Sequence, residues 1–178
     1  MSQALPLHCH DDTPCVAVRS VQVELQRQAS QQLCLRYQIS ADLQALRVPP
    51  VVTPRCCDEL WQHCCCELFV ADEDGYSEYN FSPSSCWAAY HFDGYRTGRR
   101  DLAVRQAPTV QCQSTAGGLV LTAQLDLKDL LPAAPTSLRI ALAVVIESSN
   151  GALSYWALRH APGRADFHHA AGFMDLEL

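Results

Sequence analysis

Residues 119–127 read LVLTAQLDL and residues 138–146 read LRIALAVVI. In both stretches an apolar residue stands at every second position. Successive side chains of a strand point to opposite faces of a sheet, so this period predicts a strand with one face on a core. The same period recurs over residues 21–26 and 33–40. The dominant period is thus two residues rather than the 3.6 of an amphipathic helix, which indicates a β protein.

Turn residues separate these stretches and divide the rest of the chain into further short segments. Asn150-Gly151 is a favourable hairpin turn, because both residues tolerate a positive φ. Residues 127–131 fit a single helical turn before Pro132. Further strands are expected at residues 65–71, 76–81, 87–92, 155–159 and 173–178. About ten short strands separated by turns predict a single antiparallel β-sandwich with a jelly-roll-like arrangement.

Length and charge narrow the class of protein. A chain of 178 residues suits one domain, so we expect a single domain over residues 1–178 with a flexible N-terminus at residues 1–14. The net charge is −6 and the arginines are scattered, which argues against nucleic acid as a partner. No apolar run reaches the roughly 18 residues of a membrane span, and the start lacks the pattern of a secretory signal. We therefore expect a soluble cytoplasmic protein without a membrane partner, and its oligomeric state is left open.

Ten cysteines are the unusual feature of the composition. Without a secretory signal they are expected to stay reduced, and most of them to pack as small hydrophobic side chains. Residues 56–66 hold six cysteine and histidine donors, but these lack the separated ligand pairs of common zinc sites, so we predict no metal site. The alternative is a thiol-rich metal-binding or redox protein, with the ligands Cys57, His63, Cys64 and Cys66.

The middle of the chain, residues 58–98, concentrates aromatic side chains around two glutamates. On its predicted strand, Glu67 lies on the face opposite a row of apolar residues, and on the next strand Glu78 and Asn80 share a face. If the two faces coincide, these three side chains form a polar cluster with a tryptophan nearby. A sugar suits such a cluster, since its C–H face stacks on a ring while its hydroxyls bond the polar groups. The alternative is an ordinary solvated outer face.

The same two glutamates are compatible with glycoside hydrolysis, which uses a pair of carboxylates. However, nothing in the sequence fixes their separation. The chain also has no glycine-rich phosphate loop, nucleophile elbow or paired zinc-ligand motif. We therefore predict a protein without a catalytic centre.

Three longer sequence motifs resemble those of a known family. They are ELWQHCCCELF at residues 59–69, GYSEYNFSPSSCWAAYHFDGYRTG at residues 75–98 and SYWALRHAPGRADFHH at residues 154–169. These motifs are similar to those of the bacterial DOMON-like family, whose relatives include the family-nine carbohydrate-binding modules and the haem domains of cellobiose and ethylbenzene dehydrogenases. The resemblance implies a β-sandwich that binds a sugar, a haem or another small ligand and has no catalysis of its own.

The matching positions give the ligand-binding residues that the resemblance implies: Trp61, Glu67, Glu78, Asn80, Trp87, Tyr90, Arg96, His160 and His168. Their expected roles are ring stacking, hydroxyl bonding and charge. No cofactor is required. Haem-binding relatives use a Met and a His, but Met174 is expected in the core, which leaves His63 and His168 as candidate haem ligands. We expect a non-catalytic small-ligand-binding domain, with carbohydrate ahead of haem; the alternatives are the thiol protein described above and a protein-interaction scaffold.

Overall fold

Twelve strands form one continuous, mostly antiparallel sheet in the part of the chain that the structure, a computed structural model, describes: residues 4–28, 31–130 and 137–177. In chain order the strands are β1 (Ala4–Cys9), β2 (Val18–Arg27), β3 (Gln32–Ala41), β4 (Cys65–Asp72), β5 (Gly75–Phe81), β6 (Trp87–Phe92), β7 (Arg100–Asp101), β8 (Thr109–Thr115), β9 (Gly118–Asp126), β10 (Ser137–Glu147), β11 (Leu153–Ala157) and β12 (Met174–Glu177). Their order in the sheet is β7-β6-β5-β4-β10-β11-β1-β2-β3-β9-β8, and β12 pairs with β10. Helical structure in these residues is limited to α1 (Leu127–Leu130) and three short 3-10 turns. None of the described helices is long and apolar enough to cross a membrane.

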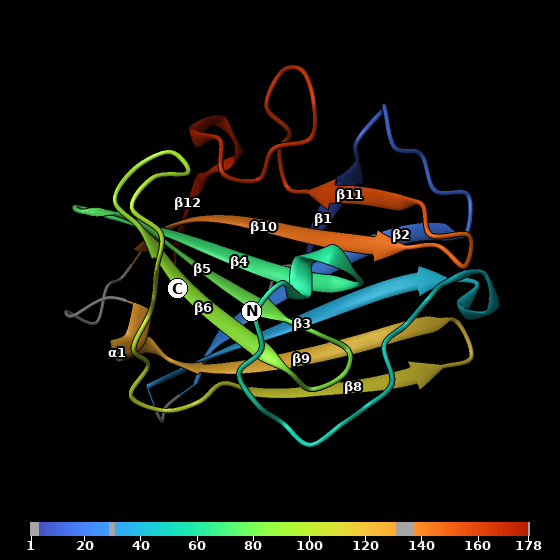
Figure 1. Cartoon of the computed structure of the whole chain (residues 1–178), viewed down its shortest axis with the longest axis horizontal. Helices are drawn as coiled ribbons and strands as arrows, with labels where there is room; N and C mark the ends of the chain where they lie inside the picture. The colour runs from blue at the N-terminus through green and yellow to red at the C-terminus, as the bar shows by residue number, and fades with distance from the viewer. Residues whose placement is uncertain (1–3, 29–30, 131–136, 178) are drawn as a thin grey trace.

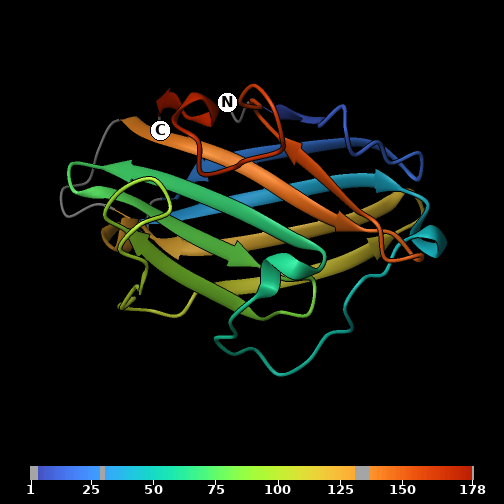
Figure 2. The ribbon, with the colours of Figure 1, turned by 45° about the horizontal axis from the view of Figure 1, so that its top comes forward.

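Strand β1 joins two halves of the sheet (Figures 1 and 2). Its residues 4–7 pair with β2, whereas His8 and Cys9 pair with β11. The sheet curls at this strand, and the inner faces of the two halves share one apolar core. The segment expected to be a flexible N-terminus therefore contains the strand that joins the halves. Its signal in the sequence is weak, because only Leu5 and Leu7 alternate, on either side of a proline.

The main core lies between the two halves of the curled sheet. Tyr37 and Leu121 enter it from one half, and Leu68 and Leu142 enter it from the other, and all four are almost fully buried. All four belong to the stretches in which an apolar residue stands at every second position. The alternation seen in the sequence therefore identifies the inner face of each strand.

Most of the predicted elements are confirmed. All nine segments predicted as strands contain a strand, although residue 178 of the last segment lies outside the described residues. The hairpin at Asn150-Gly151 joins β10 to β11, where Gly151 has a φ of +86°. The predicted helical turn is α1, although its predicted end at 131–132 lies outside the described residues. Strands β1, β7 and β8 were not predicted, so the expected ten strands become twelve. Strand β8 is a sheet edge in which only Val110 is buried, which explains its weak apolar alternation.

A second apolar cluster lies on the outer face of β4, β5, β6 and β10. Phe69, Tyr76 and Phe92 are at its centre, and the segment that follows β11 lays Phe167 and Phe173 against it. This segment covers part of the outer face and leaves a cavity beside it. The outer face is therefore partly buried, unlike the solvated face of an ordinary sandwich strand.

Candidate ligand-binding cavity

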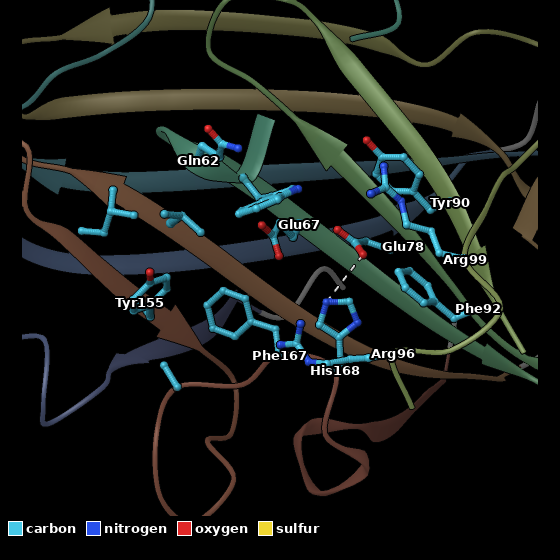
Figure 3. Close-up of a pocket in the computed structure, with 14 residues that line it drawn as sticks. Gln62, Glu67, Glu78, Tyr90, Phe92, Arg96, Arg99, Tyr155, Phe167 and His168 are labelled. Carbon is cyan, nitrogen blue, oxygen red and sulfur yellow. Dashed lines mark ion pairs between the residues drawn. The ribbon is translucent and has the colours of Figure 1, made fainter. Parts of the chain in front are cut away.

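A cavity of about 490 Å³ opens on the outer face of the half-sheet that contains β4, β5, β6, β10 and β11 (Figure 3). Its volume lies within the usual range of small-molecule sites. The lining residues are Trp61, Gln62, Glu67, Glu78, Tyr90, Phe92, Arg96, Arg99, Val145, Leu153, Tyr155, Ala165, Phe167 and His168. Six of the nine residues that the resemblance implies for ligand binding are among them.

Glu67 and Glu78 reach the cavity from neighbouring strands. Strands β4 and β5 pair Glu67 with Asn80 and Phe69 with Glu78, so all four residues share the outer face. The condition left open by the sequence, that the two polar faces coincide, is thus met in the structure. Figure 3 shows the two carboxylates close together in the cavity. Each is almost fully buried, with 2% of Glu67 and 4% of Glu78 exposed.

The two carboxylates differ in their partners. Glu78 accepts a 2.8 Å hydrogen bond from the Asn80 side-chain amide. No hydrogen bond or ion pair joins the Glu67 carboxylate to another described residue. Burial raises the pKa of Glu67 well above its usual value and the neighbouring charge of Glu78 raises it further, whereas Arg96 lowers it. Burial also raises the pKa of Glu78, against the hydrogen bond from Asn80, which lowers it.

His168 is held beside Glu78 in its neutral form. Its Nδ1 lies 2.8 Å from the Tyr76 hydroxyl, which itself accepts a hydrogen bond from the Arg96 backbone N–H. The other ring nitrogen, Nε2, faces Glu78 Oε2 at 3.7 Å (Figure 3). Burial lowers the pKa of His168 to about 4; Arg96 also lowers it, and Asp166 opposes them. At neutral pH His168 thus adds no positive charge to the cavity.

Trp61 lies on the 3-10 turn Leu60–Gln62, and 42% of its surface is exposed. This turn is tied to β6 through Asp58, which accepts hydrogen bonds from the Tyr90 hydroxyl and, at 2.6 Å, from Arg99 Nη2. The Arg99 guanidinium also lies 4.1 Å from the centroid of the Tyr90 ring, in a cation–π contact. Hydrogen bonding by Tyr90 lowers the pKa of Asp58. An exposed indole is thus held at the cavity by a charged cluster.

Arg96 forms a similar ion pair with Asp166, in the segment that follows β11. Its Nη2 donates a 2.8 Å hydrogen bond to Asp166, which also accepts one of 2.5 Å from the Tyr95 hydroxyl. Although burial raises the pKa of Asp166, these hydrogen bonds lower it overall. Both guanidinium groups of the cavity lining therefore have carboxylate partners other than Glu67 and Glu78.

Three of the nine implied residues lie away from the cavity lining. Asn80 is fully buried next to Glu78, and its side-chain oxygen has no partner among the described residues. Trp87 pairs with Phe81 on the inner face and packs against the main core. His160 lies near the N-terminal strand, where its Nε2 is 2.8 Å from the His8 carbonyl.

Several lining residues were missed by sequence reasoning. The two-residue period would have placed Phe92 on the same face as Tyr90, and Tyr155 on the outer face of β11. Arg99 and Phe167 lie on loops without periodicity, so their place depends on long-range packing that the sequence does not reveal.

The alternative thiol site is not assembled in the structure. The Cys64 thiol donates to the Arg47 carbonyl and accepts from the Glu147 N–H, while His63 Nδ1 lies 2.7 Å from the Glu147 carboxylate. Cys57 contacts Cys86 instead, and Cys66 lies in the main core. In the described part of the chain, no three His, Cys, Asp or Glu side chains are grouped so as to hold a metal ion.

The residues around the cavity do not fit a haem. His168 faces Tyr76 with one ring nitrogen and Glu78 with the other. The second candidate ligand, His63, is bonded to Glu147 and does not line the cavity. Met174 lies on β12 and is also absent from the lining.

Comparisons with known proteins show the fold of the chain. No family model and no curated protein matches it. A candidate carbohydrate-binding protein from Bacteroides uniformis matches with a TM-score of 0.69 and 13% identity, over 99% of this chain and 86% of that one. A family-nine carbohydrate-binding module from Caldicellulosiruptor kristjanssonii in complex with cellotriose gives a TM-score of 0.59 and 11% identity, over 99% and 82% of the two chains. Such a module from the same organism in complex with glucose gives 0.52 and 12%, over 89% and 75%.

Proposed function

We propose that this chain is a non-catalytic carbohydrate-binding domain and that the cavity is its sugar site. The observation that carries the proposal is the position of Trp61, a 42% exposed indole at a cavity that holds two buried carboxylates. The C–H face of a sugar ring covers apolar indole surface while its hydroxyls donate to carboxylate oxygens. The cavity offers both kinds of contact on one ligand-sized surface.

The similar structures support this function. One is described as a candidate carbohydrate-binding protein, and the other two are carbohydrate-binding modules in complex with cellotriose and glucose. They also support a jelly-roll-like sandwich forming a single domain over residues 1–178. The sequence motifs that resemble the DOMON-like family are consistent with the same assignment.

The lining residues take distinct roles in this proposal. Trp61 stacks on the sugar ring, Glu67 and Glu78 accept from hydroxyls, and Arg96 and Arg99 donate at the rim. Asn80, Tyr90 and His168 position these groups through the contacts described above. Trp87 and His160 stabilise the fold instead, since neither lines the cavity.

The arrangement of the carboxylates supports binding rather than hydrolysis. Glycosidases place two carboxyl groups so that they flank the scissile bond. Here both glutamates rise from adjacent strands of one sheet face, so they address the same side of a bound sugar. A general acid and a general base need environments that push their pKa values apart. Burial instead raises the pKa of both glutamates.

Isothermal titration calorimetry with glucose, cellotriose and a set of other saccharides tests the proposal. We expect at least one saccharide to bind with a dissociation constant in the micromolar to millimolar range. Trp61→Ala should weaken binding at least tenfold. Trp87→Phe serves as the matched control, because it changes a tryptophan on the opposite sheet face. Binding of no saccharide, or equal binding by Trp61→Ala, would contradict the proposed site.

A further inference from the structure

Two buried carboxyl groups line the cavity without a cation of their own, and this narrows the class of ligand. We propose that it takes an amino sugar, with the ammonium group at Glu67 and Glu78 and the sugar ring on Trp61. This inference rests on the proposed carbohydrate function and specifies its substrate class.

Glu67 is the first observation behind this proposal. Only 2% of Glu67 is exposed, and its side chain lines the cavity. No other described residue forms a hydrogen bond or ion pair with its carboxylate. An ionised carboxylate removed from water is costly unless it is paired and hydrogen-bonded. The partner that the fold does not supply can therefore come from a ligand, from a proton or from water in the cavity.

The cations of the lining supply the second observation. Arg99 forms an ion pair with Asp58, and Arg96 forms one with Asp166. Each guanidinium therefore already has its own carboxylate partner. The only other basic side chain in the lining, His168, is neutral at pH 7 because burial lowers its pKa to about 4. Neither glutamate therefore has a charged cation of the lining as its own ion-pair partner, although Arg96 lowers the pKa of both carboxyl groups.

An ammonium group meets the requirements of this position better than a hydroxyl does. It donates three hydrogen bonds and carries a positive charge, whereas a hydroxyl donates one hydrogen bond and carries none. The aromatic residues Tyr90, Phe92 and Phe167 line the same cavity, and aromatic rings attract organic cations.

A divalent metal ion fits the cavity less well. Calcium takes six to eight oxygen ligands, and magnesium requires a near-octahedral set. The described residues provide no group of three or more acidic, histidine or cysteine side chains for such an ion. A volume of about 490 Å³ bounded by aromatic rings suits an organic ligand instead.

Calorimetry at pH 7 with matched ligands tests directly whether a positive charge on the sugar strengthens binding. The monosaccharides are glucosamine, N-acetylglucosamine and glucose, which differ at one carbon in charge or substituent. Cellotriose and the β-1,4-linked glucosamine trisaccharide form the corresponding oligomer pair. We expect each amino form to bind at least tenfold more tightly than its neutral counterpart. If only the trisaccharide shows the preference, the ligand is a polysaccharide; if glucosamine shows it equally, the ligand is the free amino sugar.

Two charge-neutralising variants assign the preference to the cavity. Glu67→Gln keeps the shape and removes an unpartnered buried charge, so it should fold and should lose the preference for the amino form. Glu73→Gln makes the same change in an exposed turn and should keep it. Survival of the preference in Glu67→Gln would overturn the role of Glu67.

The outcomes separate this inference from the proposed function. Tight binding of glucose or cellotriose without preference for the amino form overturns the amino-sugar inference and leaves the sugar site intact. Binding of none of the five saccharides overturns the amino-sugar inference, and binding of no saccharide in the wider set overturns the proposed function as well. Displacement of bound amino sugar by calcium chloride, but not by sodium chloride at equal ionic strength, would show that the carboxylates hold a metal ion and would also overturn the inference.

Discussion

The Tyr37 hydroxyl, on β3, donates a 3.0 Å hydrogen bond to the backbone carbonyl of Glu67, on β4. This bond crosses the main core and joins the two halves of the curled sheet. The side chain of Glu67 points the other way, into the cavity on the outer face. The core therefore fixes directly the strand segment that carries the unpartnered carboxylate.

Tyr37→Phe should destabilise the protein by about 1 kcal/mol, since it removes one buried hydrogen bond and leaves the ring packing intact. The free energy of unfolding in urea measures this change. Tyr155→Phe is the matched control, because no hydrogen bond joins the Tyr155 hydroxyl to a described residue. Equal stability of the Tyr37→Phe variant and the wild type would show that the hydrogen bond between Tyr37 and Glu67 contributes nothing to the free energy of unfolding.

Glu67→Gln should stabilise the ligand-free protein at neutral pH. The pKa of Glu67 is raised in the fold, so the folded state holds its proton more tightly than the unfolded chain does. The stability from this residue is therefore present at acid pH and is lost as the pH rises above 4.5 towards the raised pKa. The difference in unfolding free energy between variant and wild type should grow over this range. A difference that is constant with pH would contradict the burial of an ionisable Glu67.

His168→Gln should change the pH dependence of stability in the opposite direction. The pKa of His168 falls from 6.5 in the unfolded chain to about 4, so the unfolded chain binds the proton more readily. The contribution of neutral His168 is complete above pH 6.5 and is lost as the pH falls through about 4, on the order of 3 kcal/mol in total. Urea unfolding of wild type and variant between pH 7 and pH 4 measures it. If the two curves are parallel, His168 is not buried as described.

Asp58→Asn should weaken sugar binding about threefold to tenfold while lowering the melting temperature by only about 2 °C or less. The Asp58–Arg99 pair is largely exposed, and such pairs add little stability. Asp58 nevertheless holds the turn that carries Trp61. Calorimetry and thermal melts separate the two effects, with Glu24→Gln on β2, a half-buried carboxylate beside Arg36, as a control outside the cavity lining. An unchanged affinity would mean that the Asp58 cluster does not position Trp61.

Native alkylation should discriminate among the ten cysteines. Cys56 is exposed, whereas Cys64, Cys65, Cys66 and Cys86 are buried. Burial raises the pKa of Cys64 to about 11, which keeps it in the unreactive thiol form. Iodoacetamide followed by peptide mass mapping should modify Cys56 first and leave the four buried thiols unmodified until urea is added. Rapid labelling of residues 64–66 would favour the redox alternative.

The inner faces of the strands could be predicted because they follow a local rule. The rows that contain Leu35, Leu121 and Leu142 place apolar side chains two residues apart, and these side chains form the core. The relative position of Glu67 and Glu78 needed the register of β4 against β5 as well. Residues 72–75 hold that signal: Asp72 pairs with Gly75, which puts Phe69 opposite Glu78.

The rest of the candidate site depends on contacts that have no local signature. Trp61 and Trp87 look equivalent in the sequence, but a 3-10 turn places the first at the cavity and the β6 register turns the second towards the main core. Asp166 meets Arg96 across seventy residues of chain, through a loop without periodicity. Such pairings arise from the packing of the whole sheet.

The three tryptophans allow a direct test of the central claim that the cavity binds sugar through Trp61. Trp156 donates its indole N–H to Ser154 and belongs to the main core, and Trp87 is partly buried against the same core. Only Trp61 lines the cavity. In proton–nitrogen NMR spectra recorded during titration with the tightest-binding saccharide, we predict that the Trp61 indole signal shifts in a saturable way while the other two stay nearly fixed. Assignment by single Trp→Phe variants identifies each signal. Saturable binding with an unmoved Trp61 signal, or no shift with any saccharide, would contradict the account.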